Sequence, residues 1–279
     1  MEMTLRWYGS KFDTVTLEQI RQIPGVTGVI TTLYDTELAR KRPDGSTVLA
    51  YTQEAVDALK PEEMFDSISG DSNGSIMPGW EPERMAHVKE LFEMYKDIDD
   101  EKLFANLKYF LERIMPVCSQ YDIYMAIHPD DPAWSVFGLP RIIINKQNIL
   151  RMMKMVDDPH NGVTFCSGSY GTNLENDLPD MIRSLKGRIH FAHVRNLKFN
   201  SPTDFEEVAH LSSDGTFDMY EIVKALYEIG FDGPIRPDHG RMIWGEVAMP
   251  GYGLYDRALG ATYLNGLWEA IDKSHKRGI

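Results

Sequence analysis

The strongest constraint on the fold is a regular alternation of short apolar runs and longer amphipathic segments from about residue 100 onward. The short runs are bounded by turn-forming residues, which is typical of buried strands, and the longer segments repeat apolar residues at helical spacing. Strands are expected at 123–129, 162–168, 188–196 and 233–240, and helices at 99–117, 145–156, 178–187, 218–230 and 255–273. Such alternation predicts an α/β fold with parallel strands and crossover helices.

The N-terminal part follows the same scheme as far as residue 35. Strands are expected at 5–9 and 26–34, and Thr16 with Gln19 forms a capping box for a helix that stops at Pro24. Residues 36–100 differ, because they are acidic and rich in turn clusters, with one weak strand candidate at 47–51 and a helix near 82–95. We interpret them as a loop-rich insertion within a single domain over residues 1–279.

Composition excludes several classes of protein. The chain of 279 residues has 42 acidic and 29 basic residues, a formal charge of −13, so a protein that grips nucleic acid is not expected. No apolar run is long enough for a membrane span, and the N-terminus lacks the pattern of a secretory signal. The two cysteines, Cys118 and Cys166, are too few for a disulfide framework, which favours the reducing cytoplasm.

Four side chains with metal-binding chemistry occur at the carboxyl ends of four consecutive predicted strands. They are His128, Cys166, His193 and Asp238. Parallel strands place these ends at one edge, where α/β proteins build their sites. Two imidazoles, a thiolate and a carboxylate suit a divalent transition metal. Taken singly, each of these residues is more simply explained as a packed or hydrogen-bonded side chain. The occurrence of all four at equivalent positions, at the ends of four successive strands, favours a metal site.

Other polar groups are expected at the same edge. His239 follows Asp238 directly, and Tyr252 lies on a loop flanked by Gly and Pro, so both are candidates to face a substrate. The arginines suited to anion recognition are Arg195, beside Asn196, and Arg241. His210 either reaches the site or packs nearby. For all of these residues, the alternative to a functional role is a structural one, in a salt bridge or in packing.

Sequence motifs resemble those of the mannonate dehydratase family. They are RWYG, AIHPDDP, FGLPRI, CSGSY, HVRN, AHLS, RPDHGR, IWG and PGYGLYDRALGATYLNGL, in the family's order, and they span most of residues 1–35 and 100–270. The resemblance implies a TIM (β/α)8-type barrel related to the xylose isomerase group. It also implies Mn²⁺ or Fe²⁺ on the four ligands above, with His239 and Tyr252 as proton-transfer groups.

The activity implied by the resemblance is loss of water from D-mannonate to give 2-keto-3-deoxy-D-gluconate in hexuronate breakdown. The partner is then a small sugar acid, with Arg195, Asn196, His210 and Arg241 as its contacts, in a homo-oligomer such as a dimer. A metal-dependent sugar isomerase or epimerase is one alternative, although the thiolate of Cys166 argues against it. The other alternative is a non-catalytic protein that binds a sugar acid. In such a protein, His239 and Tyr252 would have no proton-transfer role.

One departure from the family pattern concerns the strand count. A barrel of this type has eight strands, whereas the sequence contains six good candidates, and Asp35 runs directly into the insertion at Thr36. Two missing strands would leave the sheet with open edges, which invite aggregation. We therefore expect that a segment with two strands is missing between Asp35 and Thr36.

Overall fold

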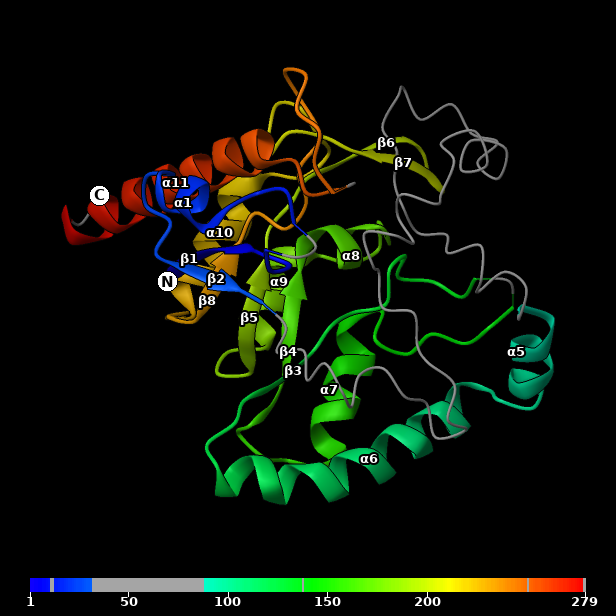
Figure 1. Cartoon of the computed structure of the whole chain (residues 1–279). Coiled ribbons are helices and arrows are strands. Elements are labelled where there is room, and N and C mark those ends of the chain that lie inside the picture. The colour runs from blue at the N-terminus through cyan, green and yellow to red at the C-terminus, as the bar shows by residue number, and fades with distance from the viewer. Residues whose placement is uncertain (11–12, 32–87, 137, 250, 278–279) are drawn as a thin grey trace.

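Six parallel strands form the central sheet of the computed structural model, which describes residues 1–10, 13–31, 88–136, 138–249 and 251–277. The order across the sheet is β2-β1-β8-β5-β4-β3 (Figure 1). The strands are β1 (Glu2–Arg6), β2 (Gly28–Ile30), β3 (Met125–Ile127), β4 (Asn161–Cys166), β5 (Ile189–His193) and β8 (Pro234–Arg236). A strand overlaps each of the six predicted runs, but β1 begins three residues before the predicted 5–9 and shares only Leu5 and Arg6 with it. The other five strands lie within the predicted runs or within one residue of them.

The first and last strands of this sheet are neighbours, as they are in a closed barrel. β1 pairs with β8 through Glu2 opposite Pro234 and Met3 opposite Ile235, and it pairs with β2 on its other side. An open doubly wound sheet does not require its first and last strands to meet, whereas a (β/α)8 barrel does. The described part is therefore a TIM-type barrel with six strands, and the gap in it lies between β2 and β3.

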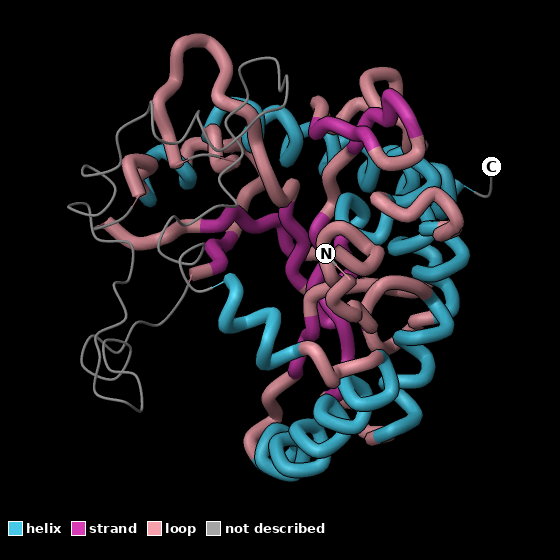
Figure 2. Tube along the Cα trace, turned by 90° about the vertical axis from the view of Figure 1, so that its right-hand side faces the viewer, coloured by secondary structure: helices cyan, strands magenta, loops and turns pink. Residues whose placement is uncertain are grey.

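The helices pack around the outside of the strands, with many of them to the right of the strands and below them in Figure 2. They are α1 (Leu17–Arg21), α5 (Val88–Tyr95), α6 (Asp100–Gln120), α7 (Lys146–Met155), α8 (Ser167–Gly171), α9 (Leu178–Ser184), α10 (Met219–Glu228) and α11 (Leu254–Arg277). Among the described residues, no helix is both long and apolar enough to cross a membrane.

Local signals in the sequence set where helices begin. Thr16 accepts a hydrogen bond from the Gln19 backbone, and the Gln19 side chain accepts one from the Thr16 backbone, which completes the predicted capping box. At the start of α6, α7 and α10, the side chains of Asp99, Asn145 and Asp218 accept hydrogen bonds from backbone N–H groups of the first turn. The predicted weak strand at 47–51 and the Asp35–Thr36 junction lie outside the described residues.

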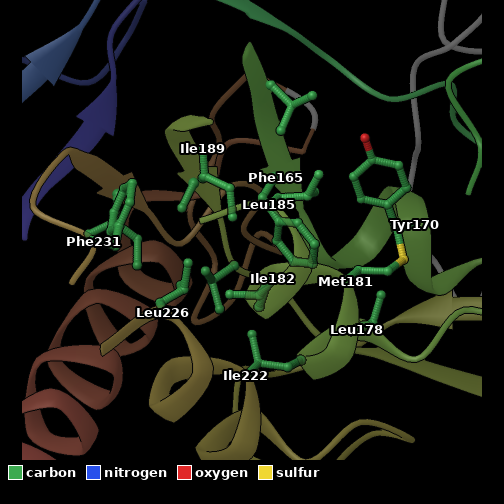
Figure 3. Close-up of a cluster of buried hydrophobic side chains, with 14 of the residues drawn as sticks. Phe165, Tyr170, Leu178, Met181, Ile182, Leu185, Ile189, Ile222, Leu226 and Phe231 are labelled. Atoms are coloured by element: carbon green, nitrogen blue, oxygen red, sulfur yellow. The ribbon is translucent and has the colours of Figure 1, made fainter. Parts of the chain in front are cut away.

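Apolar side chains of β4, β5, α9 and α10 fill the space between sheet and helices. Figure 3 shows this cluster, in which Phe165, Ile182, Ile222 and Leu226 are almost completely buried. Side chains alternate along a strand, so the residues of β4 that face the helices leave Thr164 and Cys166 to face the barrel interior. The core thereby fixes which side chains reach the site.

Truncating this core should lower stability sharply. We expect Leu226→Ala to reduce the free energy of unfolding by about 2–5 kcal/mol, because Leu226 is 0% exposed and its removal leaves a cavity. Leu174→Ala is the control, since Leu174 is 50% exposed, and it should cost less than about 0.5 kcal/mol. Urea unfolding followed by circular dichroism measures both, and equal losses would contradict the assignment of the core.

Candidate metal centre and active site

Three of the four predicted ligands form a compact group at the carboxyl ends of their strands. His128 follows β3 directly, and Cys166 and His193 are the last residues of β4 and β5, opposite each other in register. One ligand atom from each of the three lies within 4.8 Å of the others, so the group could hold a metal ion.

The carboxylate of Asp238 adjoins this group. Its Oδ1 lies 3.2 Å from His193 Nδ1, and its Oδ2 accepts a hydrogen bond of 3.5 Å from the Cys166 thiol. His193 Nδ1 is in turn 3.2 Å from His128 Nε2. The Cys166 sulfur thus faces the barrel interior and the other candidate ligands.

The hydrogen bonds of the two histidines leave donor atoms available for a metal. His128 Nδ1 lies 2.8 Å from the Pro129 carbonyl, and since a carbonyl only accepts, Nδ1 carries the proton and the lone pair is on Nε2, the atom that faces His193 Nδ1 at 3.2 Å. His193 Nε2 is buried and has no hydrogen-bond partner among the described residues. A buried nitrogen without a partner is costly, so these side chains fit a site that takes a cation.

The protonation states of these residues follow from their burial. Burial lowers the pKa of His128 and, more strongly, that of His193, so both imidazoles are neutral as metal ligation requires. Burial, together with the charge of Asp238, raises the pKa of the Cys166 thiol to about 12. A cation is needed there to favour the thiolate.

Asp238 is held in a strained backbone conformation. Its φ of 64° lies in the left-handed region, which a non-glycine residue adopts at a cost that functional sites often bear. His210 Nε2 donates a hydrogen bond of 2.5 Å to the carbonyl of the preceding Pro237. Although burial raises the pKa of Asp238, the surrounding cations, His239 first among them, hold it well below the usual range.

His239 and Tyr252, the two predicted proton-transfer groups, lie beside each other next to these ligands. Their ring centroids are 5.5 Å apart. His239 Nε2 lies 3.9 Å from Asp238 Oδ1, and a bridge between Gly240 and Tyr252 brings the loop back to the end of β8. Tyr8 packs edge-on against Tyr252, with ring centroids 4.9 Å apart.

Glu207 is a member of this site that the sequence did not reveal. Its Oε1 accepts a hydrogen bond of 2.8 Å from His239 Nδ1. Burial opposes protonation of His239, but Asp238 and Glu207 together raise its pKa. The bond directs Nε2 of His239 away from Glu207, as the orienting carboxylate does in other acid–base pairs.

A β-hairpin delivers Glu207 to the site. The hairpin consists of β6 (Leu197–Ser201) and β7 (Asp204–Glu207), which pair antiparallel outside the main sheet. Neither strand was expected from the sequence. The signal for a hairpin in the sequence is weak. It consists of the turn-forming Pro202 between two short runs of residues, with Phe199 in the first run and Phe205 in the second.

The four predicted substrate contacts are engaged within the protein. Arg195 forms ion pairs with Asp131, Glu207 and Asp238. Arg241 binds Asp256 through two nitrogens at 2.9 and 3.0 Å, Asn196 is 0% exposed and donates to the Leu211 carbonyl, and His210 bonds to Pro237. Their role in substrate binding stays a prediction.

A cavity of about 280 Å³ adjoins the metal-binding group. Its lining residues are Arg6, Tyr8, Ile30, Thr164, Phe191, His193, Arg236 and Tyr252. Arg236 donates a 2.8 Å hydrogen bond to Asp238 Oδ1, and the guanidinium of Arg6 lies 4.6 Å from the centre of the Tyr8 ring. Arg6, Tyr8 and Arg236 were not predicted as site residues, although Arg6 and Tyr8 belong to the RWYG motif.

These features define a class of protein: an α/β barrel with a group of metal-binding side chains at the carboxyl ends of its strands. Comparison with known proteins narrows the class. The family model for D-mannonate dehydratase (UxuA) matches residues 1–37 and 34–278. The chain belongs to the mannonate dehydratase family.

Relatives and a solved structure agree with this assignment. A mannonate dehydratase of Brachyspira hyodysenteriae is 53% identical over 355 residues, covering 99% of this chain and 100% of that protein. One of Thermotoga maritima is 46% identical over 358 residues, with 99% of each chain covered. The crystal structure of mannonate dehydratase from Streptococcus suis serotype 2 has a TM-score of 0.79 at 36% identity, covering 99% of this chain and 96% of that one.

The two cysteines allow a matched test of the metal site. Cys166→Ala should weaken binding of a divalent transition metal by more than about tenfold, because a ligand is lost. Cys118→Ala removes a thiol that is equally buried but lies on α6, and it should leave the metal content unchanged. Dialysis followed by elemental analysis measures both, and metal retained by the Cys166 variant would exclude this residue as a ligand.

The pairing of Glu207 with His239 predicts a change in pH dependence. Glu207→Gln removes a charge that stabilises the protonated imidazole, so the pKa of His239 should fall. We expect the limb of the pH–activity profile that depends on His239 to move about one unit toward lower pH, with metal content unchanged.

Glu206→Gln is the control for this variant. Glu206 precedes Glu207 on β7, so its side chain points to the other face of the hairpin and the profile should stay as it is. A profile that stays in place for both variants would show that Glu207 does not act on His239.

Proposed function

We propose that the protein is a metal-dependent lyase that removes water from D-mannonate to give 2-keto-3-deoxy-D-gluconate in hexuronate catabolism. Membership of the mannonate dehydratase family supports this function. The observation that carries it is the position of His239, whose Nδ1 is bonded to Glu207 and whose Nε2 lies 3.9 Å from Asp238 Oδ1. A proton-transfer group is thereby fixed beside the candidate metal ligands.

The residues that would hold the metal are His128, Cys166, His193 and Asp238, with Mn²⁺ or Fe²⁺ as the ion. Their donor set and the buried, unpartnered nitrogen of His193 fit such an ion. A bound divalent cation supplies positive charge that stabilises the negative charge developing on the substrate carboxylate as the C2 proton leaves.

His239 and Tyr252 supply the proton transfers of this reaction. The C–H bond at C2 breaks, and its proton passes to one of the two groups; the other group gives a proton to the C3 hydroxyl, which leaves as water. The enol that results becomes the 2-keto product when C3 takes up a proton and the C2 hydroxyl loses its proton. Glu207 holds the His239 ring in place for its transfer, and Tyr8 packs against Tyr252.

The cellular setting follows from the same proposal. The partner is a small sugar acid, bound with contributions from Arg195, Asn196, His210 and Arg241. Both cysteines are free thiols in the structure, which suits the cytoplasm. A homo-oligomer, such as a dimer, is the expected assembly.

Turnover by the metal-loaded protein tests the proposal. Incubation with Mn²⁺ and D-mannonate should produce a 2-keto acid, measured by a colorimetric assay and by mass spectrometry. His239→Asn should lower kcat by at least about 100-fold and keep the metal, because His239 transfers a proton and is not a ligand. Metal loss in this variant equal to that in Cys166→Ala would make His239 a ligand and overturn the assignment.

A further inference from the structure

We propose that the gap between β2 and β3 is a binding surface for a polypeptide segment of two strand–helix units, which inserts there and closes the barrel. The proposal concerns an interaction surface and does not depend on the chemistry of the metal centre. It is supported by the two strands that border the gap, by the helix beside it and by the lengths of related proteins.

Both strands at the gap have an open edge. Within the described part of the chain, β2 pairs with β1 alone and β3 with β4 alone. All six residues of β4 are buried, whereas none of the three residues of β3 is, and Val29 in β2 is 38% exposed. Parallel strands normally lie deep inside α/β proteins, so these edges are interior strands without their neighbours.

The helix that precedes β3 has an apolar stripe that is only partly buried. The stripe consists of Leu103, Leu107, Phe110, Ile114, Val117 and Tyr121, at alternating spacings of four and three residues along α6 and its C-cap. A neighbouring stripe with Phe104, Leu111, Met115 and Cys118 is buried against the rest of the protein. In the first stripe, Leu103, Leu107 and Ile114 are partly buried against the core, whereas Phe110 is 50% exposed, Val117 45% and Tyr121 66%.

The position of α6 explains this exposure. The helix runs along the lower border of the molecule in Figure 1 and leads into β3 at the open edge of the sheet. A helix in a barrel packs over its own strand and the next one. Among the described residues, no strand lies beside β3 on this side of the sheet, so the part of the stripe that would cover such a strand, with Phe110, Val117 and Tyr121, is exposed.

Related proteins are longer at this place in the chain. The alignment with the Brachyspira hyodysenteriae protein runs over 355 residues, although this chain has 279. The family model matches in two parts that meet at residues 34–37. The residues without a counterpart therefore fall between β2 and α6, where the strand order has its gap.

These observations define the occupant. A closed barrel of this class has eight strands, so two parallel strands must fit between β2 and β3, with apolar side chains toward the stripe of α6. A second copy of the chain cannot supply them in this order, because its own open edges are again β2 and β3. The occupant is therefore the two-unit segment that the relatives carry, in the same polypeptide or as a separate one.

Co-expression of two polypeptides tests the proposal. The full 279-residue chain is produced together with a tagged segment of the Brachyspira hyodysenteriae protein, namely its residues that align between Asp35 and Thr36. A one-to-one complex is expected. Amide hydrogen exchange in the chain should slow at least tenfold in Gly28–Ile30, in Met125–Ile127 and along the exposed stripe of α6.

A pair of valine variants distinguishes specific binding of the segment from non-specific hydrophobic association. Val117→Asp puts a charge on the stripe and should weaken capture of the segment at least tenfold. Val247→Asp makes the same change at a valine that is 84% exposed on the loop after β8, and capture should be unchanged. Both chains should keep their metal affinity, which distinguishes a failure here from a failure of the proposed function.

Three results would overturn the proposal. One is that the chain binds no segment and its β2 and β3 amides are already protected in the chain alone. Another is that the chain pairs with a second copy through these edges and excludes the segment. The third is that Val117→Asp and Val247→Asp weaken capture equally.

Discussion

The buried carboxylate of Asp238 is the interaction on which the site depends. It meets Arg236 at 2.8 Å, Arg195 at 3.0 Å, His193 at 3.2 Å and the Cys166 thiol at 3.5 Å. A buried charge costs several kcal/mol unless it is paired, so these partners must be in place for the chain to fold around it. The same contacts draw the ends of β4, β5 and β8 together and bring metal-binding groups to one point.

The residues expected to transfer protons are positioned by a segment outside the main sheet. A hairpin outside the sheet carries Glu207 to His239, while Arg195 pairs with Glu207 as well as with Asp238. The arginine therefore links Asp238, which adjoins the candidate metal ligands, to Glu207, the carboxylate that bonds to the His239 imidazole. Loops attached to a rigid barrel often carry such functional groups, and here the hairpin does so.

The barrel is held most firmly on the side away from its gap. Strands β4, β5 and β8 are covered by α9, α10 and α11 and share one apolar core, and the metal-binding residues lie at the ends of these strands and of β3. The residues of the edge strands β2 and β3 are less buried, although Met125 and Ile127 of β3 pack against this core. The site is therefore anchored mainly on the well-packed strands, while His128 follows the edge strand β3 and Ile30 of β2 lines the cavity.

The six strands of the main sheet, the main helices and the candidate ligands could be predicted from the sequence because they depend on local patterns. Alternation of apolar runs marks strands, capping residues mark helix starts, and residues at the ends of parallel strands must share an edge. Other features could not be predicted, because they join segments that are distant in the sequence. They are the pairing of Glu207 with His239, the burial of Arg195 among three carboxylates, and the place of Arg6 and Arg236 in the cavity. Periodicity determines which side of an element faces inward; only the packed tertiary structure decides which partner it finds there.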